Sequence, residues 1–140
     1  MATRQQVIDE ARQWLGTPWR HQGRLKGVGC DCVGHILMVP VALGLLSLDC
    51  DIAGYPRWPE PSLMGEALDK HLDRVERADL RGADVLWLKP RRVPHHLAIY
   101  TFDDTIIHAI DLQRGVTEHR LDERWRAAIA RVYRYRGLED

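Results

Sequence analysis

The chain has 140 residues, of which 45% are hydrophobic and 29% are charged, and its 20 basic and 20 acidic residues give a formal net charge of zero. This composition is ordinary for a globular domain with one core, so we predict a single domain over residues 1–140 and exclude a disordered chain or a coiled coil. Because no net charge attracts nucleic acid, we expect no nucleic-acid partner.

The beginning of the chain, MATRQQVIDEARQ, contains no apolar segment of the kind found in secretory signals. The longest apolar stretch, Ile36 to Leu48, is too short to span a bilayer as a helix. We therefore expect synthesis in the cytoplasm without a signal peptide or a membrane anchor. The chain has 3 cysteines, an odd number that favours reduced thiols over a disulfide framework.

The first part of the chain carries helical patterns. Apolar residues at helical spacing over residues 5–15 predict an amphipathic helix, and a loop rich in Gly and Arg follows from Thr17 to Asp31. An almost unbroken apolar run then predicts a second helix over Val33 to Leu46 that is buried nearly all round. Pro40 must kink this helix or end its first half, because proline lacks an amide hydrogen and clashes with the preceding turn.

The later part changes from helical to strand-like patterns. A segment rich in Pro and aromatic residues predicts an irregular excursion from Asp49 to Pro61, and a third helix is expected over Leu63 to Val75. After Gly82, short apolar segments predict strands at Val85 to Leu88, Leu97 to Tyr100, Thr105 to Ile110, Val116 to His119 and Ala128 to Tyr135. Helices followed by strands predict an α+β domain with an antiparallel sheet.

The stretch GCDCVG places a thiol at the start of the second helix. Asp31 is a preferred N-cap residue, so Cys32 falls in the first turn, where unpaired amides and the helix dipole stabilise a thiolate. The Cys32 amide is also a candidate donor to an oxyanion, and Gly34 leaves room for a substrate to approach. Cys30 lies one residue outside this environment. A small buried residue at a helix start is the alternative interpretation of Cys32.

A cysteine nucleophile needs an imidazole that accepts its proton and later protonates the leaving group. Strand alternation over PHHLAIY directs His95 and His96 to opposite faces, so one of them is expected to face the cleft. His108 shares a strand face with apolar residues and needs a partner if it is buried. A second imidazole there could hold the tautomer of the first. A zinc site formed by Cys30, Cys32, His95 and His96 remains an alternative, although the one-residue spacing of the cysteines is unusual.

Several motifs, in order, resemble the NlpC family of cell-wall cysteine peptidases over most of the chain. The segments ARQWLGTPWRHQG and GCDCVGHI resemble the family's opening helix with its Gly-Thr-Pro-aromatic stretch and its Asp-Cys-Ser-Gly nucleophile motif. RGADVLWL, HLAIY and IIHA resemble its Gly-Asp strand, its His-Val-Gly-Ile-Tyr strand and the strand that bears its third polar residue. Val33 stands where the family usually has Ser, Trp19 where it often has Tyr, and Ala83 where it has Gly.

The resemblance implies a papain-like fold and a cysteine endopeptidase that cleaves peptidoglycan stem peptides, between γ-D-glutamate and meso-diaminopimelate. It implies Cys32 as the nucleophile, His96 as the general base and acid, and His108 as the orienting residue, with the Cys32 thiolate and the His96 imidazolium as the resting pair. Trp19, Asp31 and Val33 are implied at the substrate, and no metal or cofactor is required.

The CDCVG variant most resembles the branch found in phage tails and gene transfer agents, which implies tail-tip proteins as partners and a location in a virion or tail particle. Two alternatives remain open at this point. One is a CHAP-like amidase with the same thiol and imidazole but a different target bond. The other is a non-catalytic tail protein or zinc adaptor.

Overall fold

The computed structural model describes residues 1–52, 54–57, 60–110 and 114–139. Its main element is a six-stranded sheet in which every ladder is antiparallel. In spatial order its strands are β4 (Asp73–Val75), β9 (Ile129–Arg134), β5 (Val85–Leu88), β6 (His96–Tyr100), β7 (Thr105–Ala109) and β8 (Val116–Arg120). The predicted antiparallel sheet is therefore confirmed.

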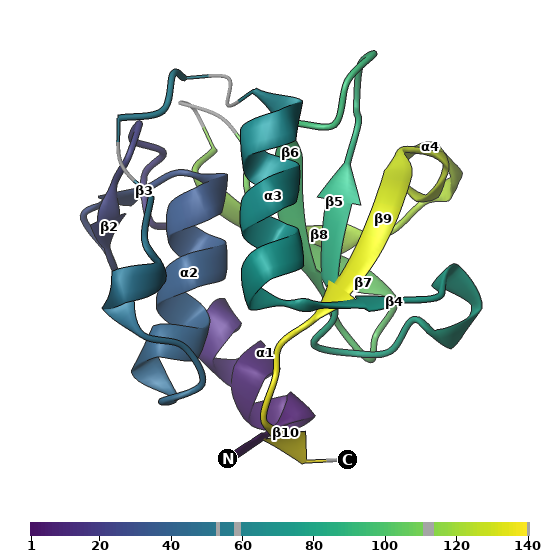
Figure 1. The fold of residues 1–140 in the computed structure, drawn as a ribbon, viewed down its shortest axis with the longest axis horizontal. Helices are drawn as coiled ribbons and strands as arrows, with labels where there is room; N and C mark the ends of the chain where they lie inside the picture. The colour runs from purple at the N-terminus through teal and green to yellow at the C-terminus, as the bar shows by residue number, and fades with distance from the viewer. Residues whose placement is uncertain (53, 58–59, 111–113, 140) are drawn as a thin grey trace.

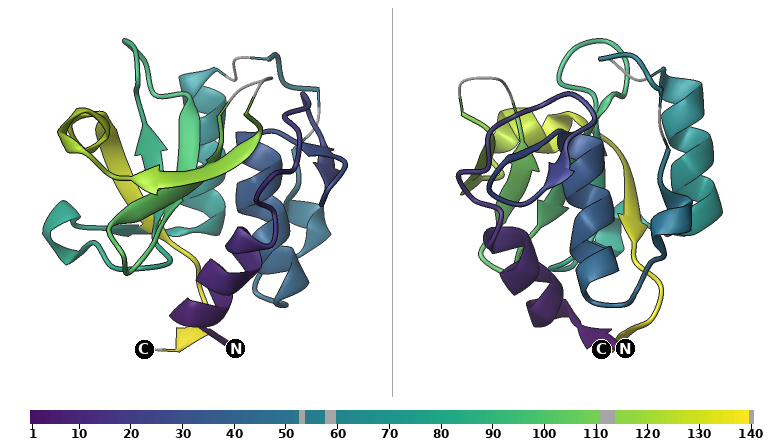
Figure 2. Two further views of the ribbon diagram at one scale, coloured as in Figure 1. Left: turned by 180° about the vertical axis from the view of Figure 1, so that it is seen from behind. Right: turned by 90° about the vertical axis from the view of Figure 1, so that its left-hand side faces the viewer.

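Helices cover the two sides of this sheet unequally (Figures 1 and 2). The long helices α1 (Arg4–Arg12), α2 (Cys32–Ala42) and α3 (Pro61–His71) lie on one side, and the short helix α4 (Glu123–Ala127) lies on the other. We call these two sides the helix side and the α4 side.

The first helix begins at a capping box. The Thr3 side chain accepts a hydrogen bond from the Gln6 amide, and the Gln6 side chain accepts one from the Thr3 amide, so two amides left unpaired at the helix start are satisfied. Val7, Ile8 and Ala11 form the buried stripe of α1. The helix predicted over residues 5–15 is confirmed, although it ends at Arg12.

The second helix begins one residue before the predicted start and ends at Ala42, four residues before the predicted end. Pro40 is part of it, and the helix continues for only two residues beyond this proline. Gly44 then adopts a φ of 73°, a left-handed conformation that terminates helices and that glycine adopts without strain. Most of α2 is buried, as its apolar run predicts.

The third predicted helix is wrong at its end. The helix α3 stops at His71, and Leu72 is extended with φ −123° and ψ 164°. Residues 73–75 form strand β4, which pairs with β9 through Asp73 opposite Arg134 and Val75 opposite Val132. Hydrogen bonds to a strand from the far end of the chain thus override the helical spacing of Val75, which sequence spacing alone does not reveal.

Several short elements have no counterpart in the sequence patterns. Strands β1 (Ala2–Thr3) and β10 (Leu138–Glu139) pair in parallel, so the two ends of the chain lie side by side (Figure 1). Strands β2 (Arg24–Leu25) and β3 (Gly29–Cys30) form a hairpin in the predicted loop before α2. The 3₁₀ turns η1 (Leu48–Cys50) and η2 (Arg77–Asp79) complete the elements. Residues 53, 58 and 59 of the predicted excursion lie outside the described residues.

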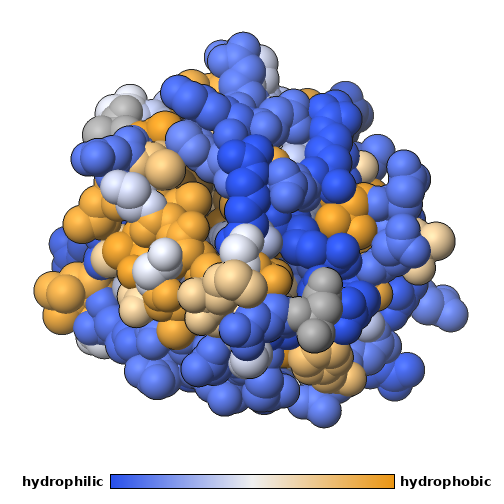
Figure 3. Space-filling model, turned by 60° about the horizontal axis from the view of Figure 1, so that its bottom comes forward, coloured by the Kyte–Doolittle hydropathy of each residue, from blue (hydrophilic) through white to orange (hydrophobic). Residues whose placement is uncertain are grey.

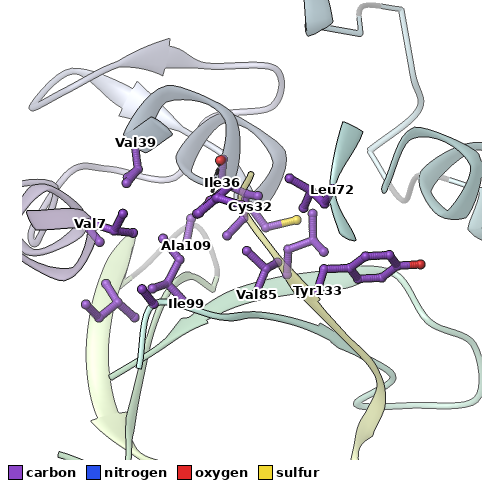
Figure 4. Close-up of a cluster of buried hydrophobic side chains, with 14 of the residues drawn as sticks. Val7, Cys32, Ile36, Val39, Leu72, Val85, Ile99, Ala109 and Tyr133 are labelled. Atoms are coloured by element: carbon purple, nitrogen blue, oxygen red, sulfur yellow. Dashed lines mark hydrogen bonds between the residues drawn. The ribbon is translucent and has the colours of Figure 1, made fainter. Parts of the chain in front are cut away.

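Two apolar clusters fill the two sides of the sheet. On the helix side, residues of α1 and α2 such as Val7 and Ile36 pack on Val85, Ile99 and Tyr133 of the strands (Figure 4). The cluster on the α4 side is smaller and is formed by Leu86, Leu88, Ala98, Ile106, Leu121, Ile129 and Val132. Because strand side chains alternate, the four central strands β9, β5, β6 and β7 each contribute to both clusters.

A buried carboxylate connects the helix side to the sheet. Asp84, at 0% exposure, forms ion pairs with Arg4 at the start of α1 (3.1 Å) and with Arg134 of β9 (2.8 Å). Its second oxygen accepts the Arg81 amide at 2.8 Å. Ala83, directly before it, has a φ of 79°, in the left-handed region that glycine adopts most easily. The Ala83 backbone is therefore in a strained conformation.

Candidate active site

Cys32 is the first residue of α2, as the sequence predicts. The Asp31 side chain caps the helix by accepting the Gly34 amide at 2.8 Å. Within the part of the chain that the structure describes, the Cys32 amide donates to no protein acceptor. It belongs to the unpaired amides of a helix start and remains available to a developing oxyanion.

The Asp31 carboxylate accepts hydrogen bonds from four protein groups. Besides the Gly34 amide, it accepts the Gln22 amide (2.8 Å), Arg24 Nη1 (3.1 Å) and the Tyr55 hydroxyl (2.6 Å). Tyr55 comes from the excursion after α2, so this segment is anchored to the start of that helix. A substrate group reaches Asp31 only by displacing one of these donors, and its predicted contact with substrate stays a prediction.

The space beside Gly34 is occupied by protein. A Cβ at this position would overlap the Gly23 carbonyl and approach Arg24 Nη1 at 3.0 Å. Glycine is therefore needed here because the loop before β2 packs directly on the first turn of α2. The expectation that Gly34 leaves room for a substrate is wrong.

The Cys32 thiol faces the backbone at the start of β6. Its Sγ lies 4.0 Å from the His95 carbonyl oxygen, and the residue is 9% exposed. Burial, with a smaller contribution from the Asp31 charge, raises the pKa of the Cys32 thiol to about 12, although the amides of Leu97 and Val33 favour the thiolate. The thiol is therefore neutral at physiological pH in this conformation.

The two predicted histidines are in direct contact. His96 Nε2 and His108 Nδ1 are 2.6 Å apart, and both residues are buried. Leu97 and Ile99 belong to the helix-side cluster, so alternation directs the His96 ring to the α4 side. The ring of Trp125 in α4 lies 6.3 Å from that of His96 and 5.2 Å from that of His108.

Burial keeps both imidazoles neutral. It is the main cause that lowers the pKa of His96 to about 3, and it also lowers the pKa of His108 strongly, with a further contribution from His96. No hydrogen bond joins Cys32 Sγ to either ring among the described residues. The thiolate–imidazolium pair expected from the resemblance is therefore not formed in this structure.

Cys32 and His96 nevertheless lie at the same end of one strand. His96 is the first residue of β6, and Cys32 Sγ contacts the backbone on both sides of it, at the His95 carbonyl and the Leu97 amide. The thiol approaches from the helix side and the ring lies on the α4 side. The structure thus brings Cys32 and His96 to the same end of β6.

A third imidazole extends the pair. His119 of β8 places its Nε2 2.7 Å from His108 Nε2, and its ring lies 5.5 Å from that of Trp125. Sequence patterns gave this histidine no role. The signal that identifies it is register, because His119 pairs with Ile106 and so shares a sheet face with His108.

The two other residues expected at the substrate, Trp19 and Val33, have different surroundings. Trp19 forms an isolated parallel bridge with Cys30, stacks on His21 at 6.5 Å and carries the Arg57 guanidinium 5.0 Å from its ring. Val33 lines an apolar cavity of about 70 Å³ between α2 and α3, together with residues such as Leu97. Figure 3 shows further apolar side chains gathered on the side where α2 lies in Figure 1. The surroundings of Val33 are therefore mainly apolar.

The proposed zinc ligands are not gathered. Among the described residues, no group of at least three His, Cys, Asp or Glu side chains is arranged to hold a metal ion. Cys30 is fully buried, with its pKa raised to about 12 mainly by burial, and His95 Nδ1 lies 2.9 Å from the Val93 carbonyl oxygen. In the described part of the chain no helix is long and apolar enough to cross a membrane.

Comparison with known proteins identifies the fold. Neither a family model nor a curated protein matches the sequence. Among solved structures, an NlpC/P60 family protein from Bacillus cereus has a TM-score of 0.69 and 22% identity, with 95% of this chain aligned to 40% of that chain. The peptidoglycan hydrolase RipB from Mycobacterium tuberculosis has a TM-score of 0.66 and 19% identity, and the alignment covers 94% of this chain and 63% of RipB.

A third similar structure differs in activity. RipD from Mycobacterium tuberculosis, described as a non-catalytic NlpC/p60 domain protein adapted to peptidoglycan binding, has a TM-score of 0.62 and 16% identity over 94% of this chain and 95% of RipD. The predicted α+β fold of the NlpC type, with a cysteine at a helix start packed on an antiparallel sheet, is confirmed. The fold occurs in both hydrolases and a non-catalytic protein, so activity must be argued from the site.

Proposed function

We propose that the chain is a cysteine peptidase that cleaves stem peptides of peptidoglycan. The observation that carries the proposal is the meeting of Cys32 and His96 at one end of β6, with the thiol against the backbone on both sides of the histidine. A nucleophile, a neutral base and an unpaired helix-start amide are the groups that acyl transfer needs. The fold shared with peptidoglycan hydrolases supports the choice of substrate.

The chemistry proceeds in two steps. The Cys32 sulfur attacks the amide carbonyl carbon while its proton passes to His96, and the oxyanion forms against the Cys32 amide. The C–N bond then breaks, and the amine leaves with the proton from His96, which gives a thioester on Cys32. Water, deprotonated by His96, hydrolyses the thioester and restores the thiol. His108 orients the His96 ring through their 2.6 Å contact.

The bond between γ-D-glutamate and meso-diaminopimelate is the proposed point of cleavage. It rests on the motif resemblance, as does delivery by a phage-like tail with tail-tip proteins as partners. Mass spectrometry of the products distinguishes this bond from the target of an amidase, because the two reactions release fragments of different mass. Cofractionation with tail particles tests the proposed location.

A second candidate is peptidoglycan binding without cleavage. The buried, neutral Cys32 thiol, which forms no hydrogen bond to an imidazole, favours this alternative. The similarity to RipD, described as a non-catalytic protein, agrees with it.

Digestion of purified stem peptides tests the proposal. We expect cleavage by the unchanged protein, no cleavage by Cys32→Ala, and most of the activity in the matched variant Cys30→Ala. Full activity of Cys32→Ala contradicts the proposed nucleophile. If the unchanged protein binds peptidoglycan in a sedimentation assay but releases no fragment, the binding function replaces the peptidase.

A further inference from the structure

Three imidazoles form a continuous chain on the α4 side of the sheet. His96 Nε2 lies 2.6 Å from His108 Nδ1, and His108 Nε2 lies 2.7 Å from His119 Nε2. The three residues come from the adjacent strands β6, β7 and β8. Trp125 packs against all three rings, with centroid distances of 5.2 to 6.3 Å. The chain of rings is thus held by the sheet and covered by one aromatic side chain.

The outer end of this chain determines where its hydrogen atoms lie. His119 Nδ1 is 3.0 Å from the Arg120 carbonyl oxygen, and a carbonyl oxygen only accepts hydrogen bonds. Nδ1 of His119 therefore carries the hydrogen. In the neutral form of His119, which carries a single N–H, Nε2 is therefore an acceptor.

The same rule fixes the two inner rings. Because His119 Nε2 accepts, His108 Nε2 donates, which leaves His108 Nδ1 as the acceptor of the His96 contact. His96 Nε2 then donates, and His96 Nδ1 carries a free lone pair. No protein group forms a hydrogen bond with His96 Nδ1 among the described residues. Burial of His96 and His108 favours their neutral forms, which this order requires.

We propose that His119 is a positioning residue that fixes, through His108, the tautomer in which His96 Nδ1 is unprotonated and able to accept the proton of the Cys32 thiol. The inference rests on the proposed peptidase function for its catalytic consequence. In the attack step, the Sγ–H bond breaks and its proton moves to the His96 Nδ1 lone pair while Sγ bonds to the carbonyl carbon. An imidazole with hydrogen on Nδ1 has no lone pair there for this proton.

Two substitutions at His119 separate its hydrogen bond from its packing. His119→Phe keeps a ring beside Trp125 but has no acceptor for His108. His119→Gln places an amide oxygen near the position of Nε2 and retains the acceptor. We expect His119→Phe to lower kcat by about 10- to 100-fold with KM changed less than about twofold, since loss of the correct tautomer is costly in triads. His119→Gln, the matched control, should retain kcat within about threefold.

Nitrogen NMR of the histidine rings, in the protein without substrate, tests the tautomers directly. The inference predicts hydrogen on Nε2 of His96 and His108 and on Nδ1 of His119, and loss of this order in His119→Phe. Hydrogen on Nδ1 of His96 in the unchanged protein overturns it, as does an active His119→Phe with unchanged kcat. If no peptide is cleaved but the spectra show the predicted order, the peptidase proposal fails and the tautomer assignment stands.

Discussion

The two sides of the sheet differ in what they bury. The helix side buries a continuous apolar cluster under three long helices, with the Cys32 thiol at its edge. The α4 side has a smaller cluster under a five-residue helix and holds a chain of three imidazoles that satisfy one another. Buried polar groups are tolerated when they are hydrogen-bonded, so the α4 side accommodates chemistry that an apolar core excludes.

The two sides of the sheet therefore contribute differently to stability and to the proposed chemistry. The helix side provides most of the apolar burial and holds the proposed nucleophile at the start of α2. In the proposed mechanism, the α4 side supplies the groups that accept and donate protons. Strand β6 is the boundary between them, and its first residue, His96, is the point where the two sides meet.

Replacing each of two adjacent histidines in turn tests most strongly whether His96, on the α4 side, is the base. His96→Ala removes the base and should lower kcat for stem-peptide cleavage by at least about 100-fold, the usual contribution of general acid–base catalysis. His95→Ala, the matched control, keeps the backbone carbonyl that contacts Cys32 Sγ and should retain most activity. Equal losses in both variants would show that the assignment of His96 from strand alternation is wrong.

The ion pairs of Asp84 test whether the helix side depends on its connection to the sheet. Asp84→Ala removes the carboxylate that pairs with the buried Arg4 guanidinium and should lower the free energy of unfolding by about 3–5 kcal/mol. The control Asp73→Ala removes an exposed pair with Arg136 and should cost about 0–1 kcal/mol. Urea unfolding of both variants measures the difference, and similar midpoints would contradict the structural role of Asp84.

Histidines buried on both sides of the sheet make the free energy of unfolding depend on pH. Burial lowers the pKa of His35, which lies in α2 on the helix side, to about 4, whereas the unfolded chain binds this proton near pH 6.5. As the pH falls from 6.5 to 4, the unfolded state takes up the proton and the folded state does not, so the folded state loses about 1.4 kcal/mol per pH unit from this residue. His96 and His108 act with the same sign from the α4 side.

His35→Leu removes the helix-side contribution alone. The variant should show a flatter fall in the free energy of unfolding between pH 6.5 and 4, by up to about 1.4 kcal/mol per pH unit, with the His96 and His108 contributions retained. Urea unfolding at several pH values measures the slope. A slope equal to that of the unchanged protein would mean that His35 is protonated in the folded state.

The smallest predicted effect concerns backbone strain before Asp84. Ala83→Gly relieves the left-handed φ of 79° and should raise the free energy of unfolding by about 0.5–1 kcal/mol. Ala98→Gly, at a buried position in the middle of β6, is the control and should destabilise the protein. A lower melting temperature for Ala83→Gly contradicts the strain argument.

The parts of the fold that depend on local patterns were predictable. The apolar spacing of α1, the apolar run of α2 and the short strands β5 to β9 all follow from residues close together in sequence. Strand β4 and the parallel pair of β1 and β10 were not predictable, because their hydrogen bonds join residues far apart in the chain. Val75 shows the difficulty, since its helical spacing relative to Leu72 carries no information about β9.

In the candidate site, too, some features could be predicted from local sequence and others depend on residues far apart in the chain. The helix-start position of Cys32 follows from N-cap preference. The contact of His96 with His108 was expected from the motif resemblance, because alternation within one strand does not place residues of two strands on the same face. His119 required the register of β8 against β7, and the enclosure of Asp31 required Tyr55 from a distant segment. The neutral state of the thiol depends on burial in three dimensions, which a resemblance in sequence does not report.

The central claim is that a neutral Cys32 thiol rests against β6 and gives its proton to a neutral His96 only during attack. The rate of alkylation by iodoacetamide as a function of pH tests it most directly, in a Cys30→Ala, Cys50→Ala background where Cys32 is the only thiol. The account predicts slow alkylation at pH 7 and a rate that rises about tenfold per pH unit up to at least pH 10, because the pKa of Cys32 is raised to about 12. A rate that is already constant below pH 7, and that falls in His96→Ala, would reveal a resting thiolate–imidazolium pair and contradict it.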